Sequence, residues 1–420
     1  MNRALLVGAP LKRAGARRIM QEHLEELARL ADTAGAEVVG VVTQQMDRPH
    51  SGTYLGAGKL DELRDKAVET GATLVIFDDE LSPTQGKNIE DAIGQRVVDR
   101  AELILDIFAT RARSSEARMQ VELAQLEYML PRLTRMWTHL EKFRGGIGVR
   151  GPGETQLETD RRLINHRIKL LRARLRDVMT ARAVQRSSRH GMFKVSLVGY
   201  TNAGKSSILR ALATDADVVV EDRLFATLDP LTREVALEEH SHVLVTDTVG
   251  FIRKLPHHLV ASFRATLEET RDADLLLHVV DASHPVWEDQ KQVVEQVLEE
   301  LDLGEKPTLV VFNKIDALTD EQLLALQSRV SAPGGAVFVS ALAEGGLDPL
   351  RRALLAAVRA RRPLSEIRMS TSDGKLLASV HREGEVVEQR TDGDRLIVRA
   401  RVGDALAGRL RSAGAEVEPV

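Results

Sequence analysis

Short apolar runs alternate with helical patterns along the first quarter of the chain. The runs that predict buried strands are Ala4–Val7, Val38–Val42, Leu74–Phe77 and Val97–Val98. Apolar residues at helical spacing predict helices over Arg17–Leu30 and Leu60–Val68. Strands that alternate with helices are typical of a parallel sheet, so residues 1–112 are predicted to form an N-terminal α/β domain.

The pattern changes over residues 113–190, where apolar residues recur at spacings of three and four. One series comprises Met119, Leu123, Leu126, Leu130, Leu133, Trp137 and Leu140, and the other comprises Ile164, Ile168, Leu171, Leu175 and Val178. Both are heptad seams, the pattern of helices that pack along each other. The glycine-rich segment Gly145–Gly153 between them cannot be helical. The pattern therefore predicts a long antiparallel helical hairpin with a glycine-rich tip, whose first arm Pro131 should kink or interrupt.

A second alternating region follows over residues 191–362. Its predicted strands are Lys194–Val198, His242–Thr246, Leu275–Val280, Thr308–Phe312 and Ala336–Val339. A boundary is predicted at Arg361-Arg362-Pro363, and residues 363–420 are predicted to form a small C-terminal α+β domain. Its predicted strands are Val386–Gln389 and Arg395–Val402, with helices near Lys375–Val380 and Ala405–Leu410.

Composition narrows the class of protein. A chain of 420 residues is long enough for two to four domains. It has no cysteine, which excludes disulfides, thiolate metal sites and cysteine nucleophiles. No segment reaches the roughly 18 continuous apolar residues that a membrane-spanning helix needs. The expected location is the cytoplasm.

The net charge of −4 hides a strong local asymmetry. Residues 111–190 hold 18 Lys and Arg against 8 Asp and Glu, which leaves a net +10 there and −14 on the rest of the chain. One interpretation of the basic segment is an arginine-rich solvated face with local ion pairs. The arginine-containing, glycine-rich tip favours the other interpretation, a surface that binds nucleic-acid phosphates.

A phosphate-binding loop is predicted at Gly199–Ser206, which fits the pattern G-x-x-x-x-G-K-[ST]. It follows an apolar strand and precedes a predicted helix over Ser207–Leu212, the context that the motif requires. Backbone N–H groups and the helix N-terminus would bind the β-phosphate. Lys205 would bridge the β- and γ-phosphates, and Ser206 would bind Mg²⁺. The alternative is a glycine-rich turn between a strand and a helix.

Two further motifs follow predicted strands. In Asp247–Gly250, the carboxylate can hold Mg²⁺ and the Gly250 N–H can contact the γ-phosphate. In Asn313–Asp316, the Asp316 carboxylate can accept from N1–H and the N2 amino group of guanine, a pair of donors that adenine lacks. The backbone amides of Ser340–Leu342 could then meet guanine O6.

The order of these motifs resembles that of a P-loop GTPase G-domain. Thr227 lies between the P-loop and Asp247 and resembles the switch I threonine that closes on Mg²⁺ and the γ-phosphate. Ser206, Thr227 and Asp247 are thus the predicted Mg²⁺ ligands, and Lys205, Thr227 and Asn202 the predicted catalytic residues. The residues predicted to contact GTP or GDP are Gly199, Tyr200, Thr201, Asn202, Ala203, Gly204, Lys205, Ser206, Ser207, Phe225, Ala226, Thr227, Leu228, Asp229, Asp247, Thr248, Val249, Gly250, Asn313, Lys314, Ile315, Asp316, Ser340, Ala341 and Leu342.

Longer strings resemble one family in particular, the HflX GTPases. The strings are Thr53–Lys59, Asp78–Pro83, Gln120–Leu126, Leu130–Leu133 and Gly145–Glu158. The resemblance implies a GTPase that binds the large (50S) ribosomal subunit and its rRNA and splits or rescues stalled ribosomes. It also implies that the tip inserts toward the peptidyl-transferase region, through Gly145, Gly146, Gly148, Arg150, Gly151 and Gly153.

The resemblance carries further expectations about partners. ATP binding by the N-terminal region is described for the family. The free protein is expected to be a monomer, and peripheral attachment to a membrane is an alternative to a purely cytoplasmic location. Gly56–Lys59 imitates a phosphate loop, but Leu60 replaces the serine or threonine. A structural or RNA-contacting loop is therefore preferred there over a second nucleotide site.

GTP hydrolysis is expected to require an activator. Phe251 follows Gly250, where many GTPases place the glutamine that orients the attacking water, so intrinsic turnover should be slow. Asn202 could bind K⁺ and place a positive charge near the transferred phosphate. Alternatively, the ribosome could stimulate hydrolysis by ordering switch I.

Two other classes of function are alternatives to a ribosome-associated GTPase. One is a binding module, in which the nucleotide only stabilises a ribosome-associated scaffold. The other is an RNA-modifying enzyme under GTP control, for which the sequence has no SAM-type glycine-rich turn, cysteine nucleophile or metal cluster.

Overall fold

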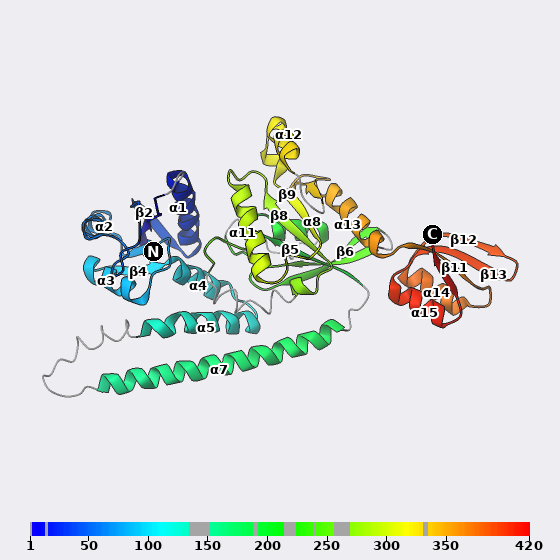
Figure 1. Ribbon diagram of the computed structural model, residues 1–420, viewed down its shortest axis with the longest axis horizontal. Coiled ribbons are helices and arrows are strands. Elements are labelled where there is room, and N and C mark those ends of the chain that lie inside the picture. Colours follow the sequence, from blue (N-terminus) through cyan, green and yellow to red (C-terminus); the bar gives the residue numbers. More distant parts are fainter. Residues whose placement is uncertain are drawn as a thin grey trace. The chain divides into compact units, whose positions relative to one another are not determined.

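The computed structural model describes residues 2–12, 16–133, 152–187, 192–213, 224–238, 241–255, 269–330 and 335–420 (Figure 1). The chain folds into two compact units. The first comprises Met1–Arg182, Glu221–Asp229 and Ile252–Thr266, and the second comprises Ala183–Val220, Pro230–Phe251 and Leu267–Val420. Two short segments of the predicted G-domain sequence therefore belong to the same unit as the N-terminal domain.

The first unit is built on a four-stranded parallel sheet of order β2-β1-β3-β4. Its strands are β1 (Asn2–Gly8), β2 (Ala36–Thr43), β3 (Leu74–Phe77) and β4 (Arg96–Asp99), and its helices are α1 (Ala16–Thr33), α2 (Ala57–Thr70), α3 (Pro83–Ile93) and α4 (Arg100–Arg111). The predicted α/β fold is confirmed. Helix α3 was not predicted, although Ser82 and Gln85 form a capping box at its start with Pro83 in the first turn.

The first hairpin arm is α5 (Ser115–Met129), followed by the 3-10 turn η1 (Leu130–Arg132), so the helix is interrupted at Pro131 as predicted. The second arm, α7 (Pro152–Ser187), runs back along α5 (Figure 1). The apolar residues that join the arms are Leu123, Ile168, Leu171 and Leu175, with Met119, Leu126, Leu130 and Ile164 at their edge. Both predicted seams thus contribute to one interface. Trp137, Leu140 and residues 145–151 of the predicted tip lie outside the described residues. The prediction that the whole of Gly145–Gly153 is not helical is wrong at its end, because Pro152 and Gly153 begin α7, where proline is tolerated in the first turn.

Arg132 attaches the first arm to the sheet. Its guanidinium donates to the backbone oxygen of Leu81 at 2.7 Å and lies 3.6 Å from the centre of the Tyr128 ring. It also contacts the Asp99 carboxylate at 3.4 Å, which accepts a 2.9 Å bond from the Tyr128 hydroxyl. All of these groups are buried, so the end of α5 is held to β4 by satisfied polar contacts.

The second unit contains a six-stranded sheet of order β10-β9-β8-β5-β7-β6. Its strands are β5 (Phe193–Gly199), β6 (Leu231–Glu238), β7 (Ser241–Asp247), β8 (Leu275–Asp281), β9 (Thr308–Asn313) and β10 (Ala336–Phe338). Its helices are α8 (Lys205–Ala213), α11 (Trp287–Glu300), α12 (Asp320–Arg329) and α13 (Asp348–Arg361), with the 3-10 turn η2 at Ile315–Ala317. All five predicted strands are present, and the unpredicted β6 is antiparallel to β7.

The C-terminal residues form an antiparallel sheet of order β12-β13-β11-β14 with two helices, in a β-α-β-β-α-β sequence. The elements are β11 (Leu364–Ser370), α14 (Gly374–Glu383), β12 (Glu385–Asp392), β13 (Arg395–Arg401), α15 (Asp404–Ser412) and β14 (Glu416–Pro419). The predicted strands and helices are found, and β11 and β14 are additional. No helix within the described ranges is long and apolar enough to cross a membrane.

Candidate nucleotide-binding site

The P-loop connects β5 to α8 in the second unit. Lys205 is buried, and its Nζ donates to the backbone oxygens of Gly199 at 3.1 Å and Tyr200 at 3.0 Å. Burial lowers the pKa of Lys205 to about 8, against the opposing charge of Asp247. Gly204 has a φ of +94°, and a Cβ there would lie 2.2 Å from Nδ2 of Asn313. Only glycine fits at this turn, which brings the loop against the third motif.

The predicted metal ligands of this unit meet at the carboxyl ends of adjacent strands. Ser206 Oγ, in the first turn of α8, donates a 2.6 Å hydrogen bond to the carboxylate of Asp247, the last residue of β7. Thr248 ties the following loop to β5 through a 2.6 Å bond to the Leu197 oxygen. Hydroxyl and carboxylate oxygens are hard ligands of the type that Mg²⁺ prefers, so this pair fits the predicted metal.

Phe251 contributes through its backbone, which the sequence did not reveal. Its N–H donates to the Gly199 oxygen at 3.0 Å, and its oxygen accepts from the Thr201 N–H at 2.7 Å. Its side chain is buried, as expected for a packing residue. Gly250, just before it, lies so close to the P-loop that a Cβ would be 2.7 Å from the Thr201 Cα and 3.0 Å from Lys205 Nζ. The D-x-x-G motif is thus joined directly to the P-loop.

Asn313 links the P-loop to the last predicted loop. Its Nδ2 donates to the Ala203 oxygen at 3.0 Å, and its Oδ1 accepts from the Ala341 N–H at 3.2 Å. Lys314 has a φ of +64°, and its ammonium forms a 2.7 Å ion pair with Asp281 at the end of β8. These three contacts are internal to the protein, so they order the site that would hold the base.

Asp316 is exposed within η2, where its carboxylate is accessible to a ligand. Ser340 is buried, and its Oγ accepts from the N–H groups of Leu342 at 3.2 Å and Ala343 at 3.1 Å. The Ser340–Leu342 loop is therefore ordered next to Asn313. The contacts of Asp316 and of these amides with guanine stay predictions.

The predicted switch I residues pack in the first unit. Phe225 has a φ of +56° and is buried, with its ring centre 4.6 Å from that of Phe108 on α4 in an edge-to-face arrangement. The Asp229 carboxylate accepts from the backbone N–H groups of Arg113 and Ser114, at the start of α5. The position of Asp229 therefore gives it a structural partner that the sequence did not predict. The roles of Thr227 and Asp229 toward GTP stay predictions.

Three family models cover most of the chain. Residues 21–109 match "GTP-binding GTPase N-terminal", residues 111–189 match "GTP-binding GTPase Middle Region" and residues 194–314 match "50S ribosome-binding GTPase". A GTPase HflX from Magnetococcus marinus is 45% identical over 413 residues, which is 98% of this chain and 94% of that protein. The chain belongs to the HflX family of GTPases.

A second relative agrees with this assignment. The GTPase HflX of Flavobacterium psychrophilum is 52% identical over 298 residues, 71% of this chain and 72% of that protein. A crystal structure of a GTP-binding protein from Sulfolobus solfataricus in complex with GDP is 24% identical, with a TM-score of 0.44, over 86% of this chain and 99% of that chain. As an HflX, the protein is a GTP-binding enzyme that hydrolyses GTP, as its motifs predicted.

Proposed function

We propose that this HflX uses GTP to control its binding to the large ribosomal subunit, and that it separates or rescues stalled ribosomes. The observation that carries the proposal is the basic hairpin. Its α5 and α7 arms pack through one apolar seam, and Arg132 anchors the first arm to the N-terminal sheet. An arm that is attached in this way is suited to support a basic segment that binds RNA phosphates. The match of residues 194–314 to a 50S ribosome-binding GTPase supports the same partner.

For the chemistry, we propose that Lys205 stabilises charge on the transferred phosphate. Ser206, Thr227 and Asp247 would hold Mg²⁺, which would neutralise charge shared by the β- and γ-phosphates. The buried phenyl ring of Phe251 has no group that can orient the attacking water. Slow intrinsic hydrolysis follows from this, with K⁺ bound near Asn202 or the ribosome itself as the activator.

Two comparisons separate the possible activators. If K⁺ acts through Asn202, turnover should be faster in KCl than in NaCl, and Asn202→Ala should remove the difference. If the ribosome acts, added large subunits should raise turnover in either salt. Identical rates in both salts would exclude the K⁺ route, and rates unchanged by large subunits would exclude stimulation by the ribosome.

Cosedimentation with large subunits tests the proposed partner. We expect more protein to sediment with a non-hydrolysable GTP analogue than with GDP. Arg150→Ala, or deletion of residues 145–153, should weaken this binding and leave GTP affinity intact. Equal sedimentation of these variants would refute the role of the hairpin tip.

Lys205→Ala distinguishes an enzyme whose GTP hydrolysis releases it from the ribosome from a scaffold that only needs bound nucleotide. An enzyme whose turnover releases it from the ribosome should lose ribosome-dependent function when Lys205 is removed. A scaffold would keep that function without turnover. Ribosome splitting can be followed directly, as the loss of the 70S peak in a sucrose gradient.

The remaining parts of the proposal concern the setting of the protein. A ribosome partner places it in the cytoplasm, and the free protein is proposed to be a monomer. ATP binding by the N-terminal domain is proposed from the family resemblance alone, and Gly56–Lys59 is the segment there that imitates a phosphate loop. At Gly56–Lys59, Gly56 caps α2 without a side-chain hydrogen bond and Lys59 forms a 2.7 Å ion pair with Glu62. Ala57–Lys59 form the first turn of α2, so this segment is the start of a helix and not the loop that the sequence predicted.

A further inference from the structure

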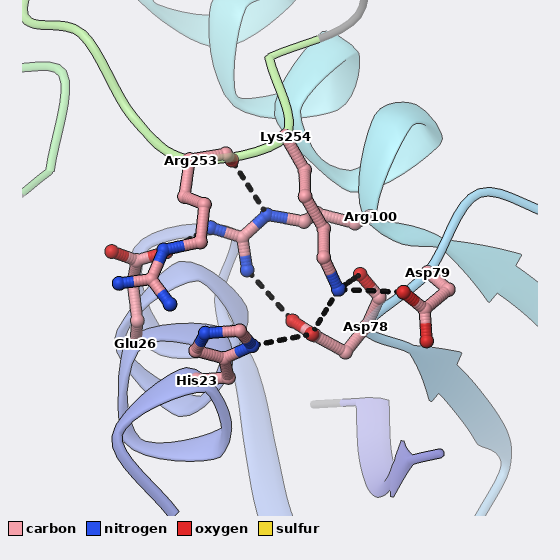
Figure 2. A network of polar contacts seen from close by, with 7 residues as sticks. All are labelled: His23, Glu26, Asp78, Asp79, Arg100, Arg253 and Lys254. Atoms are coloured by element: carbon pink, nitrogen blue, oxygen red, sulfur yellow. Dashed lines mark hydrogen bonds and ion pairs between the residues drawn. The ribbon is translucent and has the colours of Figure 1, made fainter. Parts of the chain in front are cut away.

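A cluster of charged residues in the first unit holds a segment that follows the D-x-x-G motif (Figure 2). Lys254 Nζ lies 2.6 Å from the Asp78 carboxylate and 2.6 Å from that of Asp79, both just after β3. It also donates to the Asp78 backbone oxygen at 3.3 Å. The Lys254 ammonium has three N–H donors, and these three oxygens can accept all of them. The arrangement is therefore a specific binding site for one lysine side chain.

Arg100 completes the cluster from the first residue of α4. Its Nη1 donates to Asp78 at 2.8 Å, its Nε donates to the backbone oxygen of Arg253 at 3.2 Å, and its Nη2 pairs with Glu26 (Figure 2). The Arg100 side chain is buried. Arg253 is therefore held through its backbone oxygen, and the next residue, Lys254, is held through its side chain. We call these contacts of Arg253 and Lys254 with Asp78, Asp79 and Arg100 the Lys254 clamp.

The electrostatics of the cluster favour the charged form of Asp78. Burial alone would raise the pKa of its carboxyl, but the hydrogen bond from His23 and the charges of Arg100 and Lys254 hold that pKa below its usual range. Burial, and then the charge of Asp79, raises the pKa of Tyr54, which keeps its phenol protonated. Tyr54 belongs to Thr53–Lys59 and Asp78–Asp79 to Asp78–Pro83, two of the strings that resemble the HflX family, so these two strings meet at this cluster.

The clamped segment is a direct continuation of the nucleotide site. Lys254 lies four residues after Gly250, and only Phe251, Ile252 and Arg253 separate them. At the other end, Phe251 pairs with the P-loop backbone and Gly250 lies next to Lys205 Nζ. Phe251 and Ile252 are both buried. The hold on Lys254 therefore reaches Gly250 through only three residues of backbone.

We propose that Asp78 and Asp79 are positioning residues for GTP: by holding Lys254, they keep Gly250 beside Lys205, where its N–H can contact the γ-phosphate. GDP has no γ-phosphate, so the clamp should favour GTP over GDP. By linkage, GTP should in turn strengthen the clamp. The inference rests on the GTPase activity of the family and not on the ribosomal part of the proposed function.

The test compares the affinities of the full chain for a non-hydrolysable GTP analogue and for GDP. Lys254→Met and Asp79→Asn each remove part of the clamp at its partly exposed side. We expect each to lower the ratio of analogue to GDP affinity at least about five-fold, with GDP affinity and thermal stability near those of the wild type. The double variant should fall little further than Lys254→Met alone, because both changes remove the same contact.

Lys12→Met is the matched control, since it breaks the 3.0 Å ion pair with Asp47 elsewhere in the first unit. It should leave the ratio unchanged. An unchanged ratio in folded Lys254→Met and Asp79→Asn would overturn the proposal, and a raised ratio would contradict its direction. Because GDP affinity is measured alongside, loss of all nucleotide binding in the wild type would instead count against the GTPase site itself.

Discussion

The backbone N–H of Ser114, at the start of α5, donates a 3.1 Å hydrogen bond to the carboxylate of Asp229. The N–H of Arg113 donates to the same oxygen at 3.2 Å, and the Ser114 hydroxyl contacts the other oxygen. A residue predicted to lie in switch I therefore satisfies donors at the beginning of the first hairpin arm.

Asp229→Ala should loosen the start of α5. The change removes an acceptor for two backbone amides and for the Ser114 hydroxyl, and loss of a helix cap typically costs about 1 kcal/mol. Hydrogen exchange should show faster exchange of amides in the first turn of α5. Thr319→Ala is the control: it removes the cap of a different helix, α12, and should leave exchange in α5 unchanged. Unchanged exchange in α5 would show that Asp229 does not stabilise this helix.

Arg132→Met should destabilise the first unit by about 3 kcal/mol, because it leaves the buried Asp99 carboxylate without its charged partner. A urea titration followed by circular dichroism measures the loss. Arg395→Met is the matched control: it breaks an exposed ion pair with Glu416 and should cost less than about 1 kcal/mol. Equal effects of the two changes would argue against the anchoring role of Arg132.

Asp316→Asn should weaken GTP binding about 100-fold, since it removes a charged acceptor for two guanine donors. Binding of ATP, which lacks those donors, should be as weak as in the wild type. Isothermal titration measures both. The control is Asp320→Asn, a change in the first turn of α12 nearby in sequence. If Asp316→Asn bound GTP normally, the base would have to be recognised elsewhere.

His278 should make stability depend on pH. It is buried in β8, where burial, followed by the charges of Lys291 and Lys205, lowers its pKa to about 3. The unfolded chain, with a histidine pKa near ~6.5, then binds more protons than the folded chain between these two values. The stabilisation is therefore complete above pH ~6.5 and is lost as the pH falls.

His278→Gln tests this dependence. From pH 7 to pH 5, the free energy of unfolding of the wild type should fall by about 2 kcal/mol more than that of the variant. His381→Gln, at a surface position, should keep the wild-type dependence. Parallel pH profiles for the wild type and His278→Gln would show that His278 does not titrate as predicted.

Buried strands were the part of the fold that the sequence predicted best. Leu74–Phe77 is buried at every position, so its apolar run is unbroken and its bounds match the prediction. Strands β6 and β11 were not predicted, because charged residues interrupt their apolar pattern: Arg233, Glu234 and Glu238 in β6, and Glu366 and Arg368 in β11. β11 pairs with β13 and β14, which are distant in the sequence, whereas β6 pairs with the next strand, β7.

In the site too, the parts with a local sequence pattern were predicted and the parts without one were not. The P-loop and the Asp247 and Asn313 motifs were found because each needs particular side chains at a short spacing. Phe251 acts through backbone atoms that any residue has, so its pairing left no signal in the sequence. The contact between Asp78 and Lys254 joins residues 176 positions apart, which no local pattern reveals.

Helix α7 has a consequence for how the hairpin tolerates change. Its 36 residues span about 54 Å at a rise of 1.5 Å per residue. Removing one residue would shorten it by only about 1.5 Å but would rotate everything beyond by about 100°. Removing seven would shorten it by about 10 Å and nearly restore the original face. The angular phase of the helix, more than its length, therefore determines which side chains reach a target at its far end.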